Sequence, residues 1–166
     1  MTRMRQKKAD RKAQEEQLFS ELAEQMTEDP RCHEMKQFIQ HGTISTYDHC
    51  LSVAKMSYRM NRRLHLHCRE DALIKGAFLH DYFLYDWHHH DKRWHGFTHP
   101  AKAAENAARD FALDSKERNI IESHMWPLTL LHLPRSREAA VVCMADKICS
   151  LRETLLCRSE SHKSRE

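Results

Sequence analysis

Six histidine and aspartate residues stand where a helical protein would ordinarily bury apolar side chains. They are His49, His80, Asp81, His99, His124 and Asp146. Imidazole nitrogens and carboxylate oxygens are the donors that divalent transition metals take from proteins. The sequence therefore predicts that these side chains converge on one or two metal ions inside the fold.

The spacing around these residues places them on buried helix faces. His80 ends a stripe with the i, i+3, i+4, i+7 spacing that contains Leu73, Gly76 and Ala77. Asp146 ends an equivalent stripe that contains Ala139, Val142 and Cys143. His49 shares a flank with Val53 and Met56, and His124 shares a stripe with Ile120 and Ile121. His99 stands at the predicted start of another helix, so five helices contribute to the set.

Each member of this set also has an ordinary structural interpretation. A single histidine on an apolar face is usually a hydrogen-bonded core residue. A buried ionised aspartate is harder to accommodate, because losing its hydration costs several kcal/mol unless it is paired or metal-bound. One metal site would offset the cost of burying all six polar side chains together. The mixed nitrogen and oxygen donors suit Fe, Mn, Zn, Ni or Mg without selecting one, and disfavour a closed structural zinc site.

Composition indicates the fold class. The 166 residues suit one domain, and the shares of apolar (40%) and charged (31%) residues are those of a soluble globular protein. The chain has only three glycines and four prolines, and alternating strand-like runs are nearly absent. These features predict an all-α compact bundle of about six to seven helices.

Apolar periodicity and capping signals predict where the helices lie. Ser45 with Asp48, and Asp114 with Glu117, are typical of helix N-termini, whereas Gly42 is typical of a helix C-terminus. Gly76 would let another helix, or a ligand, approach closely. The predicted helices span about 9–28, 31–40, 45–63, 69–80, a segment starting at His99-Pro100, a segment starting at Asp114, and 136–157. The predicted organisation is an N-terminal helical extension packed on the core (1–44), a metal-binding helical domain (45–157) and a polar, disordered tail (158–166).

The stretch from Tyr82 to Thr98 is predicted to be a long connection that walls or covers the site, because long aromatic loops in compact domains tend to carry function. The histidine run at 88–90 is open to two interpretations, an outer-sphere acid/base or a polar loop. Three tryptophans could stack on a base or pack in the core: Trp87, Trp94 and Trp126.

Charge and targeting signals limit the partners. A net charge of +3 does not by itself indicate nucleic acid. The basic start of the chain is interpreted as a solvated helix end, and the alternative is an arm that binds nucleic acid or phospholipid. No apolar run suits a signal peptide or a membrane span. The six cysteines have no C-x-x-C pairing, which favours reduced thiols in a cytoplasm. A homodimer is left open.

The order of His49, the adjacent pair His80-Asp81, and Asp146 resembles that of the HD-domain superfamily of metal-dependent phosphohydrolases, over roughly residues 45–156. The resemblance implies an all-α core in which these four residues hold one metal. His99 and His124 match the subgroup that binds two metals, with Asp81 bridging to the second.

Two subgroups of that superfamily differ from this chain near the pair. HD-GYP phosphodiesterases carry a lysine three residues after the aspartate, where this chain has Leu84. The synthetase-linked hydrolases of guanosine tetraphosphate carry acidic residues shortly after the pair, where this chain has Phe83, Leu84 and Tyr85. Neither substrate is therefore expected here.

The chemistry and the resemblance together predict a metal-dependent phosphohydrolase that uses a metal-activated water on a small phosphate ester or nucleotide. Asp81 and Lys147 are the expected catalytic residues. Candidate phosphate contacts, each equally interpretable as solvated surface charge, are Lys92, Arg93, Lys147 and Arg152. Two alternatives remain: a di-iron oxygenase on the same scaffold, and a non-catalytic module that binds metal or a nucleotide.

Overall fold

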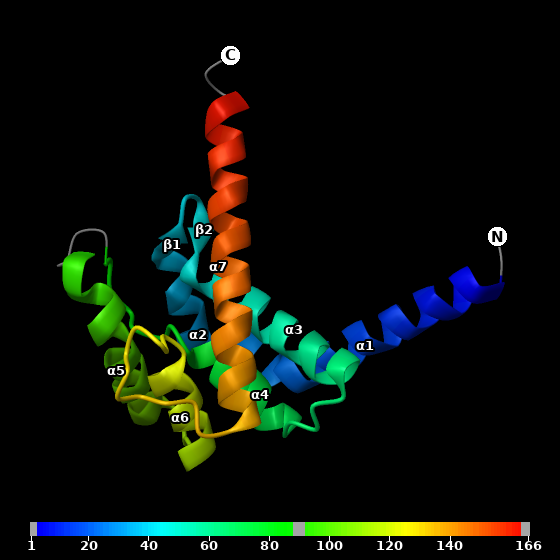
Figure 1. Ribbon diagram of the computed structural model, residues 1–166, viewed down its shortest axis with the longest axis horizontal. Helices are drawn as coiled ribbons and strands as arrows, with labels where there is room; N and C mark the ends of the chain where they lie inside the picture. The colour runs from blue at the N-terminus through cyan, green and yellow to red at the C-terminus, as the bar shows by residue number, and fades with distance from the viewer. Residues whose placement is uncertain (1–2, 88–91, 164–166) are drawn as a thin grey trace.

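The computed structural model describes the backbone of residues 3–87 and 92–163, and within these ranges the side chains other than those at 3, 41, 92, 93 and 158–163. This part of the chain forms seven α-helices, one 3-10 helix and one two-stranded hairpin. The prediction of an all-α bundle of six to seven helices is confirmed. Figure 1 shows the helices gathered around a central body from which the first half of α1 and the second half of α7 project.

Four helices enclose the core. They are α3 (Thr46–Leu64), α4 (Glu70–Leu79), α6 (Ser115–Ser123) and α7 (Arg137–Lys163). Helix α3 packs on α4 and α7, and α6 packs on α4 and α7. Helix α5 (Lys92–Asp110) covers α6 and presents a small-residue face in which Ala103, Ala104 and Ala107 are buried.

The predicted capping signals at the starts of two of these helices are confirmed. The Ser45 hydroxyl accepts a hydrogen bond from the backbone N–H of Asp48 at 3.1 Å and so caps α3. Asp114 and Glu117 form a complete capping box at the start of α6. These caps fix where each helix begins and therefore which residues face the core.

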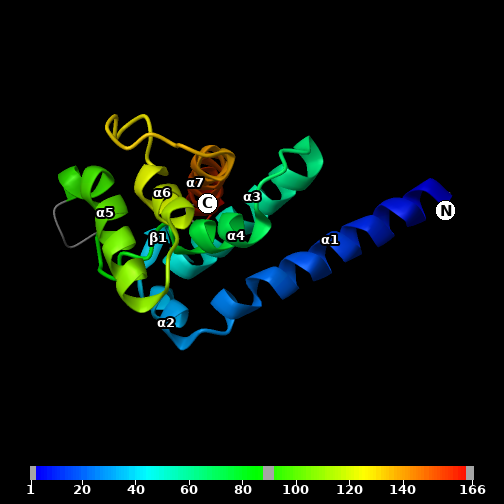
Figure 2. The ribbon, with the colours of Figure 1, turned by 90° about the horizontal axis from the view of Figure 1, so that it is seen from below.

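Helix α1 (Arg3–Thr27) lies against α4 with its C-terminal half only. Figure 2 shows its N-terminal half running away from the body. The buried stripe consists of Phe19, Ala23 and Met26, whereas the apolar side chains of Leu18 and Leu22 are exposed. The division of the chain at residues 44 and 45 stays a prediction.

The segment predicted as a second helix over 31–40 is different in the structure. A single turn of α2 (Pro30–His33) passes into the 3-10 helix η1 (Glu34–Gln37), and strand β1 (Ile39–His41) follows. Strand β1 pairs antiparallel with β2 (Ile44–Ser45). Gly42 does adopt a left-handed conformation with φ of 57°, but it lies in the hairpin turn and not at a helix C-terminus.

Two further boundaries differ from the predictions. Helix α5 begins at Lys92, so His99 and Pro100 lie inside it and the connection after Tyr82 is shorter than expected. The predicted disordered tail from residue 158 is helical through Lys163. No helix in the described ranges has the length and apolar character needed to cross a membrane. Cytoplasmic location and a homodimer stay predictions.

Candidate metal centre

All six residues predicted as metal ligands are buried in one region. His49 lies in the first turns of α3, and His80 and Asp81 immediately follow α4. His99 lies within α5, His124 immediately follows α6, and Asp146 lies in α7. The predicted inward direction of these side chains is confirmed by their burial.

Four of these side chains form a first group. His49 Nε2 lies 3.3 Å from Asp146 Oδ1 and 3.8 Å from Asp81 Oδ2. His80 Nε2 lies 3.4 Å from Asp81 Oδ2 and 3.7 Å from Asp146 Oδ1. Two imidazole nitrogens and two carboxylate oxygens from three parts of the chain therefore lie close together.

Asp81 also belongs to a second group. Its Oδ1 atom lies 3.1 Å from His99 Nε2 and 3.4 Å from His124 Nε2, and these two nitrogens are 2.8 Å apart. The two oxygens of one carboxylate thus face different groups, with Oδ2 toward the first and Oδ1 toward the second. This arrangement is that of a carboxylate able to bridge two ions.

The distances within both groups suit a metal ion. Donors bound to one ion at about 2.0–2.2 Å are separated by about 2.8 Å when adjacent at right angles, and by up to about 4.4 Å when opposite. The seven donor–donor distances given above, from 2.8 to 3.8 Å, fall inside this range. Two sets of three residues each bring their donor atoms within 4.8 Å of one another. They are His49, His80 and Asp81, and Asp81, His99 and His124.

Backbone carbonyls fix the orientation of three imidazole rings. The Nδ1 atoms of His80, His99 and His124 lie 2.7, 2.8 and 2.7 Å from the carbonyl oxygens of residues 77, 95 and 121. A carbonyl only accepts, so each Nδ1 carries the proton and, in a neutral ring, each Nε2 presents a lone pair. Two such lone pairs 2.8 Å apart, at His99 and His124, repel unless a proton or a cation lies with them.

The fourth ring is oriented by a carboxylate. His49 Nδ1 lies 2.8 Å from Glu153 Oε2, and both side chains are buried. A histidine that donates to a carboxylate through one nitrogen, and faces a metal with the other, is a recurring arrangement in metalloproteins. Sequence reasoning missed Glu153, although it lies seven residues after Asp146 and therefore returns to the same face of α7.

Gln40 and Ser150 hold the two aspartates. Gln40 Nε2 donates to Asp81 Oδ2 at 2.7 Å, and the Ser150 hydroxyl donates to Asp146 Oδ1 at 3.2 Å. Sequence reasoning missed Gln40 because its segment was predicted as helix. The β1–β2 hairpin delivers this amide to the centre. In the described part of the chain, Asp81 Oδ1 and His80 Nε2 remain buried without a hydrogen bond, as expected of atoms reserved for a cation.

The charges of the centre are strongly coupled. Burial would raise the pKa of Asp81, but the His80, His99 and His124 rings hold that pKa well below its usual range. Burial likewise opposes a charge on His49, yet Asp146 and Glu153 raise its pKa to about 10. The pKa of Asp146 is likewise lowered against the effect of burial, by His49 and His80, so Asp81 and Asp146 are ionised near neutral pH, which is the form that binds metals.

Burial, together with the charge of the neighbouring His80, lowers the pKa of His124 from 6.5 to about 3. A neutral His124 is the form whose Nε2 lone pair can bind a metal.

Lys147, the second predicted catalytic residue, is held beside the centre. Its Nζ donates to the carbonyl oxygens of His124 at 3.0 Å and Cys143 at 3.2 Å, and to Cys143 Sγ at 3.2 Å. An ammonium group has three protons, so these contacts use its full donor capacity. Its catalytic role stays a prediction.

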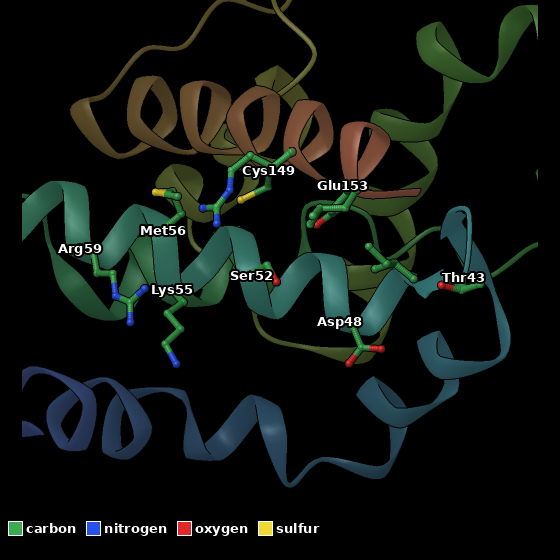
Figure 3. A pocket seen from close by; sticks show the side chains of 11 residues that line it. Thr43, Asp48, Ser52, Lys55, Met56, Arg59, Cys149 and Glu153 are labelled. Carbon is green, nitrogen blue, oxygen red and sulfur yellow. The ribbon is translucent and has the colours of Figure 1, made fainter. Parts of the chain in front are cut away.

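The other candidate substrate contacts are dispersed. Arg152 lines a cavity of about 500 Å³ between α3 and α7, which none of the six predicted ligands lines. Figure 3 shows Glu153 on the wall of this cavity, so the His49–Glu153 pair separates it from the centre. Trp87 stacks on His95, while Trp94 and Trp126 are largely exposed. The side chains of Lys92 and Arg93, and residues 88–90, lie outside the described part.

Comparison with known proteins supports the geometric interpretation. The family model for the HD domain matches residues 46–151, which is more than half of the chain and contains all six predicted ligands. No curated protein and no solved structure matches the chain. The chain therefore belongs to the HD domain family and is a member of a superfamily of metal-dependent hydrolases.

Proposed function

We propose that this protein is a metal-dependent phosphohydrolase that acts on a small phosphate ester or nucleotide. The observation that carries the proposal is the pair of donor groups that share Asp81, each with the spacing of a metal site. His49, His80, Asp81 and Asp146 would hold the first ion. Asp81, His99 and His124 would hold the second.

The donor set defines the class of metal. Four imidazole nitrogens and two carboxylates suit Fe, Mn, Zn or Ni, and Mg fits less closely because it prefers oxygen. Bound divalent cations would lower the pKa of water at the site and offset the charge of a phosphoryl group.

The chain's own residues contribute orientation and burial. The carbonyl contacts of His80, His99 and His124 aim their Nε2 atoms at the centre before any ligand arrives. Preorganised donors in a site closed to bulk water act more strongly than the same groups in solution. In the proposed reaction water attacks phosphorus, the ester P–O bond breaks, and the departing alcohol takes up a proton.

The test is metal analysis of protein purified without oxygen, followed by a phosphatase screen with Mn²⁺, Mg²⁺, Ni²⁺ and Fe²⁺. We expect release of inorganic phosphate, and loss of at least 100-fold in kcat in the Asp81→Asn variant, because a bridging charge is removed (about 10²–10³ for one such interaction). Asp71→Asn, at a surface carboxylate that is 68% exposed, is the matched control. Absence of turnover with every metal and ester would contradict the assignment.

One observation favours a second candidate, a di-iron oxygenase. Asp81, His99 and His124 make up two histidines and one carboxylate, the set that non-haem iron oxygenases use. This candidate predicts iron in the purified protein and oxygen uptake with substrate. A non-catalytic module would instead bind its ligand without turnover, and Asp81→Ala would leave that binding unchanged.

A further inference from the structure

The centre is accessible from the side of Asp146. Its side chain is 10% exposed, compared with 5% or less for the other five predicted ligands. Asp146 is also the one member of the six among the described residues that line a cavity of about 540 Å³. The remaining lining residues are Met125, Pro127, Leu128, Lys147 and Ser150. This cavity, which we call the Asp146 cavity, is the route by which a substrate would meet the metals.

The walls of the Asp146 cavity are mostly apolar. Met125, Pro127 and Leu128 belong to the connection between α6 and α7, which Figure 1 shows beside these helices. The start of α5 supports this wall, because a Cβ placed on Gly96 would lie 3.1 Å from Leu128 Cδ2. The same connection exposes further apolar side chains, with Leu130 at 71% and Leu131 at 91% exposure. The connection therefore carries apolar side chains both on the cavity wall and on the exposed surface.

The polar groups of the Asp146 cavity are already engaged. The Lys147 ammonium donates to three acceptors in the protein, and the Ser150 hydroxyl donates to Asp146. Among the described lining residues no other side chain can donate a hydrogen bond. A nucleoside polyphosphate needs several cationic or N–H partners beyond the metals, and these walls do not offer them.

We propose, on the basis of the proposed function, that the substrate is a phosphate monoester whose alcohol carries an apolar alkyl or aryl group that occupies the Asp146 cavity. The phosphate would lie at the metal centre and the apolar group against Met125, Pro127 and Leu128. Hydrolysis consumes one water and yields the apolar alcohol and inorganic phosphate. Each methylene buried in such a cavity strengthens binding about fourfold, equivalent to about 0.8 kcal/mol.

The experiment separates this inference from the proposed hydrolysis. Affinities of ethyl-, butyl-, hexyl- and octylphosphonate, which cannot be hydrolysed, are measured by calorimetry on the Mn²⁺-loaded protein, with AMP and ATP as polar comparisons. The expected result is a roughly fourfold gain per methylene until the cavity is full, with AMP and ATP weaker than hexylphosphonate. Affinity that does not change with chain length, or ATP as the tightest ligand, would overturn the inference.

Two variants test whether the gain in affinity per methylene arises in the Asp146 cavity. Leu128→Ser should reduce the gain per methylene to below twofold, whereas Leu64→Ser, at an exposed leucine at the end of α3, should leave it unchanged. Equal slopes in both variants would also overturn the inference. The matching n-alkyl phosphates are assayed for phosphate release in parallel. Phosphate release from other esters but not from the n-alkyl phosphates would overturn the inference, whereas absence of release from every ester would contradict the proposed function.

Discussion

The side chains that hold the predicted ligands lie on both sides of the segment that matches the HD domain. Gln40 precedes this segment and Glu153 follows it, yet both contact its centre. Gln40 fixes Asp81 at the oxygen that faces the first group, and Glu153 fixes the ring of His49. At the scale of single residues, the geometry of the centre therefore depends on the flanking chain as well as on the family core.

Replacing Glu153 should weaken metal binding without unfolding the protein. In Glu153→Gln the amide oxygen can still accept from His49 Nδ1 but has no charge, so we expect about tenfold weaker binding of the first metal. In Glu153→Leu both the charge and the hydrogen bond are lost, and we expect binding of the first metal to be about 100-fold weaker. The measurement is a competition titration against a chromogenic chelator.

Glu34→Gln, at an exposed glutamate of η1, is the control and should bind metal as the natural sequence does. Unchanged affinity in Glu153→Leu would show that the contact with His49 has no part in metal binding.

Sequence reasoning correctly predicted burial where a polar residue interrupted an apolar period. His80 and Asp146 were identifiable because each ends an i, i+3, i+4, i+7 stripe. Glu153 continues the stripe of Asp146, but a glutamate near a helix end is ordinarily solvated, so its position alone predicted nothing. Gln40 gave no periodic signal, because the strand that carries it has only three residues.

At the scale of elements, α4 and α6 must approach closely for the two metal groups to share Asp81. Helix α4 leads into His80 and Asp81, and α6 leads into His124. Gly76 allows this approach, because a Cβ there would lie 2.7 Å from Ile120 Cδ1 and 2.9 Å from Cγ2. The predicted role of Gly76 in close packing is confirmed.

Gly76→Ala should therefore destabilise the fold although alanine favours helix. Alanine gains about 1 kcal/mol in helix propensity, but overpacking of a rigid contact costs about 1–3 kcal/mol. We expect a net loss of about 1 kcal/mol, measured by urea unfolding, with a lower affinity for the second metal.

Two comparisons make this test specific. Adding Ile120→Ala to Gly76→Ala removes the atoms that clash, so the double variant should be more stable than the sum of the single losses predicts. Gly96→Ala on α5 meets only the ends of the flexible Leu128 and Met125 side chains and should be neutral or stabilising. Simple additivity of Gly76→Ala and Ile120→Ala would show that the two residues do not constrain the helix pair.

The elements that sequence reasoning missed are short or interrupted. The hairpin contributes five strand residues, too few for alternation to be distinguished from a helix end. Pro100 was interpreted as a helix start because proline is favoured in a first turn. In the structure α5 begins eight residues earlier and continues through Pro100, so one lost backbone hydrogen bond did not outweigh the packing of the helix on α6.

At the scale of the whole molecule, Glu138 joins three helices. It lies in the first turn of α7, and its Oε1 accepts from the backbone N–H of Arg69 at 2.8 Å and from Lys116 Nζ at 2.9 Å. Burial acts to raise the pKa of this carboxyl, but the Lys116 and Arg69 hydrogen bonds outweigh burial and lower its pKa to about 2. The N-terminal ends of α4, α6 and α7 are thereby held together by the Glu138 carboxylate.

These contacts of Glu138 should make the stability of the fold sensitive to acid. A depressed pKa contributes stability that is present above the unfolded value of 4.5 and is lost as the pH falls toward 2. We expect Glu138→Gln to lose about 2 kcal/mol at pH 7 and much less at pH 2.5. The measurement is urea unfolding across this pH range.

Glu24→Gln, at an exposed glutamate of α1, provides the comparison and should follow the natural sequence at every pH. A loss in Glu138→Gln that does not change with pH would mean that shape, and not charge, accounts for the effect.

The central claim is that six side chains from five helices and their ends hold two metal ions that share Asp81. The most direct measurement is metal stoichiometry, by elemental analysis and titration, of the natural sequence and of His124→Ala, with the exposed His132→Ala as control. Two equivalents are predicted for the natural sequence and for His132→Ala, and one for His124→Ala, with the first site unchanged. Two full equivalents in His124→Ala, or none in the natural sequence, would contradict it.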